Sequence, residues 1–403
     1  MYGAALMADG HLGYSQPVGG VVAYREHLSV SGAGFDLSCG NRASRTNLRA
    51  DDIDVPRIMD EIAARISFGM GRPNAEPVDH PVLDKIANAD FEPQRALAPL
   101  ARSQLGTIGG GNHYVDLFSD EDGWLWVGVH FGSRGFGHKT ASGFLAMAKG
   151  GKFTDKAPPE KQDGEPVLLR EDSELGQAYL SAITLAGEYA YAGRDVVVEK
   201  VCHDILETWT VATVHNHHNH CYREVHDGNV VWVVRKGATP AWPGQRGFVG
   251  STMGEDSVIL EGLDTPAAKE LLHSTVHGAG RVMSRNEAAG KMRWRLQCCN
   301  RDCDWIAPKG TQKPECCPKC GQVKMVKRPV SEGGGKIDWA AAKADLAARH
   351  IELRGAAADE APGAYKRLDQ VLAAHADSIR VVHTLRPLGV AMAGPDTMDP
   401  FRD

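Results

Sequence analysis

The chain has 403 residues, of which 42% are hydrophobic and 24% are charged, with a formal net charge of -6 at pH 7. This composition is that of a globular protein with one large domain or two smaller ones, and it excludes a mainly disordered or fibrous chain. The sequence contains no apolar run near the roughly 20 residues of a membrane-spanning helix, and its start lacks the pattern of a secretion signal. We therefore expect a cytoplasmic protein without membrane contact. A nucleic-acid partner would need a local cluster of basic residues to overcome the negative charge.

The predicted elements follow one another in a mixed order. Residues 1–45 combine short apolar runs with glycines, a pattern typical of short strands and tight loops. Helical spacing predicts one helix over residues 54–69 and two amphipathic helices over residues 173–194 and 196–210. Strands are expected in YVDLF, WLWVGVHF and VVWVVRKGA, and helices in DWAAAKADLAARH and YKRLDQVLAAHA. The sequence therefore favours an α+β fold with mixed sheets and flanking helices over a doubly wound sheet.

Four segments each place side chains of a metal site in a glycine-rich or polar turn. They are Asp36 and Cys39 in GAGFDLSCG, Asn112 and His113 in GGGNH, His130 in VHFGSRG, and His215 and Asn216 in TVHNHHNH. Aspartate, cysteine and histidine are metal ligands, and one thiolate can serve two ions at once. Taken singly, each segment also fits a plainer interpretation, such as a hydrogen-bonded core histidine, a small buried cysteine or a polar turn. Their coincidence in one chain favours a metal centre.

A candidate nucleophile opens the segment HGAGRVMSR. The imidazole of His277, with an ordinary pKa near ~6.5, is able to attack a nucleotide phosphate at cellular pH. Gly278 and Gly280 leave backbone N–H groups free to face phosphate oxygens, and Arg281 and Arg285 add positive charge. The alternative interpretation of this segment is a glycine turn that carries a surface histidine.

Six of the nine cysteines lie between residues 298 and 320, in the two short segments CCNRDC and ECCPKCG. Paired cysteine knuckles of this kind supply the four thiolates of a tetrahedral zinc site, and the odd total argues against a disulfide framework. Cys317 and Cys320 form one pair. The other pair is expected to be Cys299 with Cys303, and Cys298 is the alternative to Cys299.

The cysteine-rich segment predicts a small zinc-ribbon-like module over residues 296–329. This module interrupts a domain that otherwise spans residues 1–403. Two roles are open for it. It either stabilises the insertion, or it offers RNA a surface with the basic residues Arg293, Arg295, Lys319, Lys324, Lys327 and Arg328.

Ten stretches in the same order carry a family resemblance over nearly the whole chain. They are ADGHLGYSQPVGG, GAGFDLSCG, GTIGGGNHYVD, VHFGSRGFGHK, HN at 215–216, RKGA, GSTMGEDS, HGAGRVMSR, DEAPGAYK and LRPLGV. With these stretches the chain resembles the RtcB family of tRNA-splicing RNA ligases. The chain begins almost at ADGH, so it is short at its N-terminus compared with typical members, and the cysteine-rich module is not part of the resemblance.

The resemblance implies a centre of two Mn²⁺ ions. It would place Asp36, Cys39 and His113 on one ion, and Cys39, His130 and His215 on the other, with the thiolate between them. Asp9 matches an acidic position near this centre.

The resemblance also implies that GTP transfers GMP to His277. The residues that it would place against the nucleotide are Asn112, His113, Tyr114, Val115, Asp116, His215, Asn216, Gly250, Ser251, Thr252, Met253, Ser257, His277, Gly278, Ala279, Gly280 and Tyr365. Arg134, Lys236 and Arg285 match positions directed at RNA phosphates. Two positions depart from the family: Asp116 replaces a glutamate, and Met392 or Ala393 stands in place of a lysine.

The expected activity is GTP- and Mn²⁺-dependent ligation of RNA 2′,3′-cyclic phosphate or 3′-phosphate ends to 5′-hydroxyl ends, as in tRNA splicing or RNA repair. One alternative is a dimetal phosphoesterase that opens RNA 2′,3′-cyclic phosphates without ligation. Another is an RNA-binding regulator that acts through its zinc module.

Overall fold

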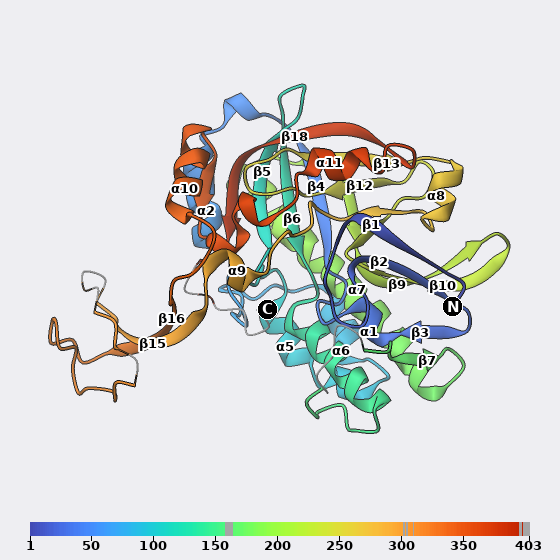
Figure 1. The fold of residues 1–403 in the computed structure, drawn as a ribbon, viewed down its shortest axis with the longest axis horizontal. Coiled ribbons are helices and arrows are strands. Elements are labelled where there is room, and N and C mark those ends of the chain that lie inside the picture. The colour runs from blue at the N-terminus through green and yellow to red at the C-terminus, as the bar shows by residue number, and fades with distance from the viewer. Residues whose placement is uncertain (158–163, 301–302, 304, 309, 395–396, 398–403) are drawn as a thin grey trace.

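The structure is a computed structural model, which describes residues 1–157, 164–300, 303, 305–308, 310–394 and 397. Its elements form a mixed α+β fold, as the sequence predicts, with two larger sheets and helices packed around them (Figure 1). Within these ranges, the helices all fall short of the length and apolarity that a membrane crossing requires.

The main sheet has eight strands, and seven of them lie side by side in the order β12-β13-β18-β5-β6-β4-β8, with β17 parallel to β18. The strands are β4 (Gly40–Arg49), β5 (Tyr114–Ser119), β6 (Trp124–Phe131), β8 (Thr210–His217), β12 (Arg246–Val249), β13 (Ser257–Gly262), β17 (Glu352–Arg354) and β18 (Ile379–Met392). The two ends of the order approach each other, because the Asn216 amide on β8 donates to the Arg246 carbonyl on β12. The sheet is therefore strongly curved.

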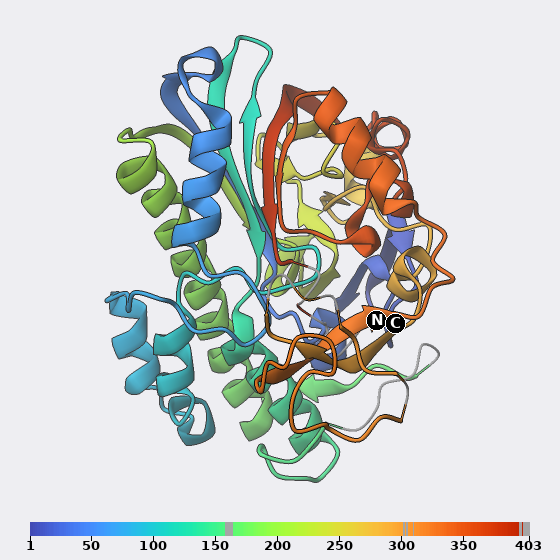
Figure 2. The same cartoon turned by 90° about the vertical axis from the view of Figure 1, so that its left-hand side faces the viewer.

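Helices cover both faces of this sheet (Figure 2). On one face, α2 (Val55–Arg65) and α7 (Glu174–Glu199) pack against alternate residues of β5 and β6, such as Val115 and Val129. On the other face, α10 (Trp339–Ala348) inserts Leu346 among Phe118, Phe248 and their neighbours. Burial on both faces requires apolar side chains of both parities, which explains the nearly continuous apolar run in β6.

The second sheet has the order β1-β2-β10-β9 and is antiparallel throughout. Its strands are β1 (Gly3–His11), β2 (Val18–Tyr24), β9 (Asn219–His226) and β10 (Asn229–Lys236). Short ladders pair β11 (Ala238–Pro240) with β14 (Ser274–Val276), and β3 (His27–Ser29) with β7 (Leu168–Arg170). Strand β9 follows β8 after one residue, so this connection joins the two large sheets.

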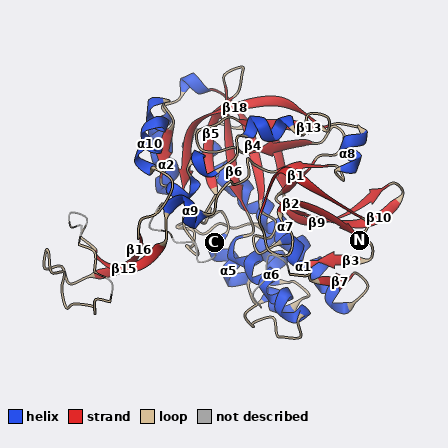
Figure 3. Cartoon of the chain, viewed as in Figure 1, coloured by secondary structure: helices blue, strands red, loops and turns tan. Residues whose placement is uncertain are grey.

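The remaining helical elements are mostly short, and α5, α6 and α7 gather beside the main sheet (Figure 3). They are α1 (Val30–Ala33), η1 (Ala50–Asp52), α3 (Pro81–Ala87), α4 (Glu92–Arg95), α5 (Ala98–Gln104), α6 (Arg134–Ala148), η2 (Lys200–Ile205), α8 (Pro266–Glu270), α9 (Arg285–Ala289), η3 (Ala358–Glu360), η4 (Pro362–Ala364) and α11 (Leu368–Ala373).

One expectation about the helices was wrong. The two helices predicted over 173–194 and 196–210 are one continuous element, because α7 runs on into the π-helical turn η2. Gly193 lies close to the predicted boundary between the two helices. A β-carbon at this position would lie 3.3 Å from the Phe131 ring. The glycine thus lets the helix approach β6 closely without ending it.

The cysteine-rich segment forms a two-stranded hairpin, β15 (Met292–Cys298) with β16 (Met325–Ser331), that projects from the body of the molecule (Figure 1). Parts of the predicted insert, residues 301–302, 304 and 309, lie outside the described residues, as does the Arg328 side chain.

Candidate active site

A cavity of about 280 Å³ lies where the two large sheets and the loops after their strands meet. Its walls come from widely separated segments, among them Asp36 and Cys39, His130 at the end of β6, His277 after β14, and Tyr365 after η4. These candidate residues, which are separated by more than three hundred positions in the sequence, therefore line the same cavity.

Three predicted ligands form the first group, in which Asp36 and Cys39 line the cavity and His113 lies behind them. One possible ligand atom from each of Asp36, Cys39 and His113 lies within 4.8 Å of the others. His113 Nε2 lies 3.0 Å from Asp36 Oδ2 and 3.6 Å from Cys39 Sγ. The other ring nitrogen, Nδ1, lies 3.0 Å from the Ile108 carbonyl, which turns Nε2 toward the group.

Cys39 also belongs to a second group, together with His130 and His218. The Cys39 Sγ lies 3.3 Å from His130 Nε2, and the His130 and His218 ring centres are 5.0 Å apart. One thiol shared by two groups of three matches the expected arrangement of a bridging thiolate. The third member, however, is His218 rather than the expected His215.

His215 and Asn216 are not part of the cavity wall. His215 accepts a hydrogen bond from Arg194 Nε at 2.7 Å and lies 3.3 Å from Asp195, and Asn216 donates to the Arg246 carbonyl. Both residues lie within β8, so their directions are fixed by its pairing with β4. His218 follows the last residue of the strand, where the chain turns into β9, and Asn219 beside it lines the cavity.

Burial keeps the two imidazoles of the second group in the neutral state that a divalent cation requires, whereas it acts in the opposite direction on Asp36 and Cys39. Desolvation lowers the pKa of His130 and of His218 well below the usual value, so both imidazoles stay neutral. Burial would raise the pKa of Asp36, but the attraction of His113 outweighs it and keeps this carboxylate charged. Burial, reinforced by Asp36, raises the pKa of the Cys39 thiol, and a bound cation is what would deprotonate it. One carboxylate, one thiolate and three imidazoles fit a pair of transition-metal ions.

A buried arginine supports the site from behind. The Arg194 side chain has no exposed surface, and its Nη1 donates to the backbone carbonyls of Ser38 and Phe131 at 3.3 and 2.6 Å. These carbonyls immediately precede Cys39 and follow His130 in the chain. Arg194 therefore fixes the backbone that carries two of the ligands.

The expected change in metal content is different for the two histidines of the run. We expect His218→Ala to remove one of two bound metal ions, because His218 belongs to a ligand group, and His215→Ala to retain both. Metal analysis of the purified variants under identical loading measures this. Equal metal loss in both variants would contradict the assignment of His218.

Asp9 lies beneath the candidate nucleophile. The His277 Nδ1 donates to Asp9 Oδ2 at 2.7 Å, and the backbone N–H groups of His277 and Gly278 donate to the same oxygen at 3.0 and 3.4 Å. Because Nδ1 carries the proton toward Asp9, the lone pair of Nε2 is left for reaction. Gly280 completes the turn with φ 75°, and a β-carbon there would lie 2.1 Å from the Asp9 carbonyl.

Replacing Asp9 with asparagine should slow the chemistry of His277 without removing it. Asparagine keeps the size but lacks the charge that holds the Nδ1 proton, so we expect nucleotide transfer to His277 to slow by about 10- to 100-fold. Single-turnover kinetics of the protein–nucleotide adduct measures this rate. An unchanged rate would show that Asp9 does not orient the imidazole.

Most of the expected nucleotide residues line the cavity. They are Asn112, Tyr114, Asp116, Gly250, Ser251, Thr252, Met253, His277, Gly278, Ala279, Gly280 and Tyr365. Ser257 lies behind them and accepts a hydrogen bond from the Ser251 N–H at 3.0 Å. Val115 is a correction: alternation along β5 turns its side chain into the core under α2, away from the cavity.

Three side chains on the wall carry buried polar atoms without a protein partner among the described residues. They are the Tyr114 hydroxyl, Asp116 Oδ1 and the Thr252 hydroxyl. Burial raises the pKa of Asp116 well above its usual value, so its carboxyl group can stay protonated and donate as well as accept. Unpaired buried groups of this kind mark where a polar ligand is received. Of the two positions that stand in place of the family lysine, Met392 lines the cavity beside them.

The three expected RNA contacts have different positions. Lys236 and Arg285 line the cavity, where Lys236 Nζ donates to the Tyr14 carbonyl and Arg285 Nε lies 3.0 Å from Glu360. Arg134 is not part of this wall. Its Nη1 lies 3.2 Å from His113 Nδ1, a position that favours a role in holding the ligand over the expected contact with a phosphate.

Several cavity residues were not expected from the sequence. They include His218, Asn219 and Glu360, the last of which lies between two arginines, 3.3 Å from Arg281 and 3.0 Å from Arg285. The segment HNHHNH contains the pair His-Asn twice, so the sequence did signal His218 and Asn219 but gave no basis for choosing them. Glu360 lies in DEAPGAYK, one of the stretches that carry the resemblance, but neither its residue type nor its spacing singled it out.

Comparisons with known proteins identify the family of the chain. The family model described as tRNA-splicing ligase RtcB matches residues 1–96 and 85–304. RNA-splicing ligase RtcB of Escherichia coli strain K12 is 28% identical over 411 residues, covering 95% of this chain and 88% of that protein. The tRNA-splicing ligase RtcB of Thermococcus kodakarensis is 29% identical, covering 96% and 86%, and that of Nanoarchaeum equitans is 31% identical, covering 70% and 74%. The chain belongs to the RtcB family.

Proposed function

We propose that this protein is an RNA ligase that uses GTP and two Mn²⁺ ions to join 2′,3′-cyclic phosphate or 3′-phosphate ends to 5′-hydroxyl ends. The observation that carries the proposal is the position of His277 beside His218 on the cavity wall. Its ring centre is 4.8 Å from that of His218, which belongs to one of the two groups that contain Cys39. A nucleophile and a two-ion site thus face the same cavity.

The reaction begins on His277. Asp9 holds the imidazole so that Nε2 attacks the α-phosphorus of GTP, a nitrogen–phosphorus bond forms, and pyrophosphate leaves. Bound divalent cations would supply Lewis-acid stabilisation of the phosphate charge. The N–H groups after Gly278 and the Arg281 guanidinium add donors on the same side of the cavity.

The nucleotide then passes to RNA. A cyclic phosphate is first opened by water to a 3′-phosphate, whose oxygen attacks the guanylyl phosphorus and releases the imidazole. The 5′-hydroxyl of the second RNA end attacks the activated 3′-phosphorus, GMP leaves, and a 3′,5′ bond forms. The position of Lys236 on the cavity wall supports a contact between its ammonium group and an RNA phosphate.

The proposed nucleotide pocket is formed by the unpaired polar groups on the cavity wall. The Asp116 carboxyl group, whose pKa burial raises, the Tyr114 hydroxyl and the Thr252 hydroxyl would provide unpaired polar atoms for a guanine base. Met392 makes this end less polar than a lysine would. The guanine edge is therefore read by neutral groups.

A dimetal phosphoesterase that opens cyclic phosphates without ligation is the rival function, because the ligand groups alone suffice for it. Incubation with α-labelled GTP and Mn²⁺ separates the two. An acid-labile, alkali-stable labelled protein supports ligation. Opening of cyclic phosphates by a protein that takes up no label would support the rival.

A further inference from the structure

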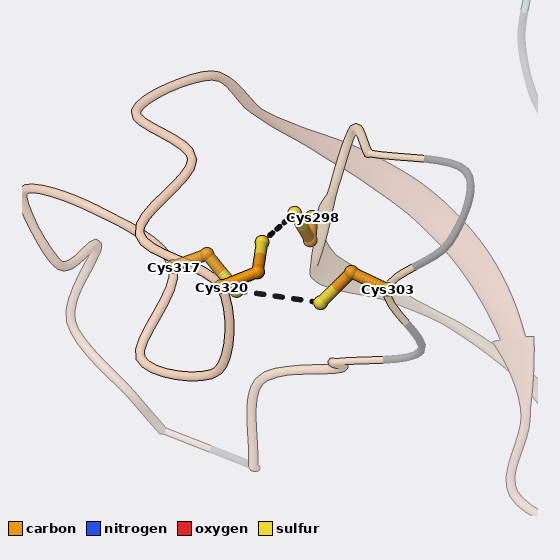
Figure 4. A group of neighbouring side chains, drawn as sticks. All are labelled: Cys298, Cys303, Cys317 and Cys320. Atoms are coloured by element: carbon orange, nitrogen blue, oxygen red, sulfur yellow. Dashed lines mark hydrogen bonds between the residues drawn. The ribbon is translucent and has the colours of Figure 1, made fainter.

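The projecting hairpin β15–β16 carries a cluster of four cysteines, none of which lines the cavity (Figure 4). The Cys298 Sγ lies 3.4 Å from that of Cys320, and the Cys303 Sγ lies 3.7 Å from that of Cys317. All four sulfur atoms lie within 4.8 Å of one another. They come from the end of β15, the loop after it and the turn before β16.

The sulfur spacing fits one tetrahedral ion. Four thiolates at about 2.3 Å from a zinc ion stand roughly 3.8 Å apart along each edge of the tetrahedron. The two shortest spacings observed, 3.4 and 3.7 Å, are close to this value, and far longer than the ~2.05 Å of a disulfide bond. The cysteines are all free thiols in the structure.

The local backbone selects these four from the six cysteines of the segment. The N–H of Asn300 points to the Cys298 sulfur at 3.4 Å, and the Gly321 N–H closes a turn onto the Cys317 carbonyl at 2.8 Å. Both contacts are typical of knuckles that wrap a metal-bound thiolate. Cys299 and Cys316 follow and precede ligand positions, and they stay outside the cluster. The expected ligand Cys299 is thus replaced by its neighbour Cys298, which the ladder with β16 turns inward.

The hairpin has almost no hydrophobic core of its own. Among the described residues from 292 to 331, the buried apolar side chains are Cys298, Ala307, Cys317 and Met325. Two of these four belong to the cysteine cluster itself. The larger apolar side chains Trp294, Ile306 and Val323 are exposed. A module of this size with so little apolar burial needs a metal or disulfides to hold one conformation.

We propose that Cys298, Cys303, Cys317 and Cys320 bind one structural Zn²⁺ ion that holds the hairpin together. Four protein thiolates fill the tetrahedral positions, so no open position is left for water or substrate. The site is separate from the two-ion centre, and its role does not depend on the proposed ligation. After β16 the chain returns to α9, where the Lys336 and Ile337 N–H groups donate to the Glu287 and Ala288 carbonyls.

The test compares neighbouring cysteines in the full chain. Protein produced with zinc is dialysed and its zinc content is measured for the wild type, Cys298→Ser and the matched controls Cys299→Ser and Cys316→Ser. We expect one zinc per chain in the wild type and both controls, and at least a tenfold lower zinc content in Cys298→Ser. Zinc retained by Cys298→Ser, or lost by Cys299→Ser, overturns the assignment.

Two further measurements keep the test decisive if Cys298→Ser folds poorly. Zinc X-ray absorption of wild-type protein, with Mn²⁺ at the two-ion centre, should give four sulfur ligands at about 2.3 Å, and nitrogen or oxygen ligands would overturn the proposal. Limited proteolysis should cut Cys298→Ser within residues 299–324 and leave the controls intact there. His277→Ala should keep its zinc. The zinc assignment and the ligation proposal are therefore tested by different measurements, and either can fail without the other.

Discussion

His277→Ala is expected to abolish the labelled protein adduct with GTP and to lower RNA ligation by at least about 10³-fold. Alanine offers no nucleophile, and the Asp9 carboxylate that orients the imidazole would face an empty space. The ligand groups around Cys39 do not include His277, so the metal content should stay unchanged. Gel detection of the adduct and joining of a labelled 3′-phosphate RNA to a 5′-hydroxyl RNA measure the two effects.

An exposed histidine provides the control for this substitution. The side chain of His203, on the π-helical turn, is 87% exposed, and His203→Ala should leave adduct and ligation at the wild-type level. Ligation by His277→Ala at a rate close to the wild type would mean that the nucleotide is carried by another residue. Loss of metal from this variant would mean that its effect is not confined to the nucleophile.

Cys39→Ala should affect both bound ions, whereas loss of a single histidine should affect one. The thiol is the only member common to the two ligand groups found among the described residues. Removing it leaves each group with two donors, fewer than the three or four that hold a catalytic metal. We expect the manganese content to fall below one ion per chain and ligation to fall by at least about 10³-fold.

Cys202→Ala is the matched control, because Cys202 is also a buried cysteine but lies in the core between η2 and the main sheet. This variant should keep both ions and most of the activity. Manganese titration followed by metal analysis distinguishes the variants. A Cys39→Ala protein that still binds two ions would rule out the bridging role.

The sequence predicted most residues of the candidate site, but it could not decide between similar residues that lie close together in the chain. Asp36 and Cys39 share one glycine-rich segment, His113 and His130 each lie in another, and the structure brings the four side chains together around Cys39. His215 was expected from the resemblance at HN 215–216, but His218 also precedes an asparagine. Only the length of β8 decides between them, since it ends at His217 and leaves His218 in the turn.

In the cysteine module, too, the sequence could not decide between neighbouring residues. Cys298 and Cys299 are adjacent, so spacing alone cannot separate them, and the pairing of β15 with β16 decides which sulfur lies inside the knuckle. The α+β class and the strands over YVDLF, WLWVGVHF and VVWVVRKGA were predicted because their apolar runs are long. The continuous helix α7 was not predicted. Gly193 lies inside this helix because it packs closely against Phe131 of β6, a contact that the sequence does not reveal.

The position of β18 has a consequence for how the protein is made. This strand comes last in chain order among the described elements, yet it lies inside the main sheet, between β13 and β5. During translation, the strands on either side of it leave the ribosome with open hydrogen-bonding edges and join only when residues 379–392 emerge. Because Val390 and Met392 also line the cavity, its wall is completed only after residues 379–392 have been made.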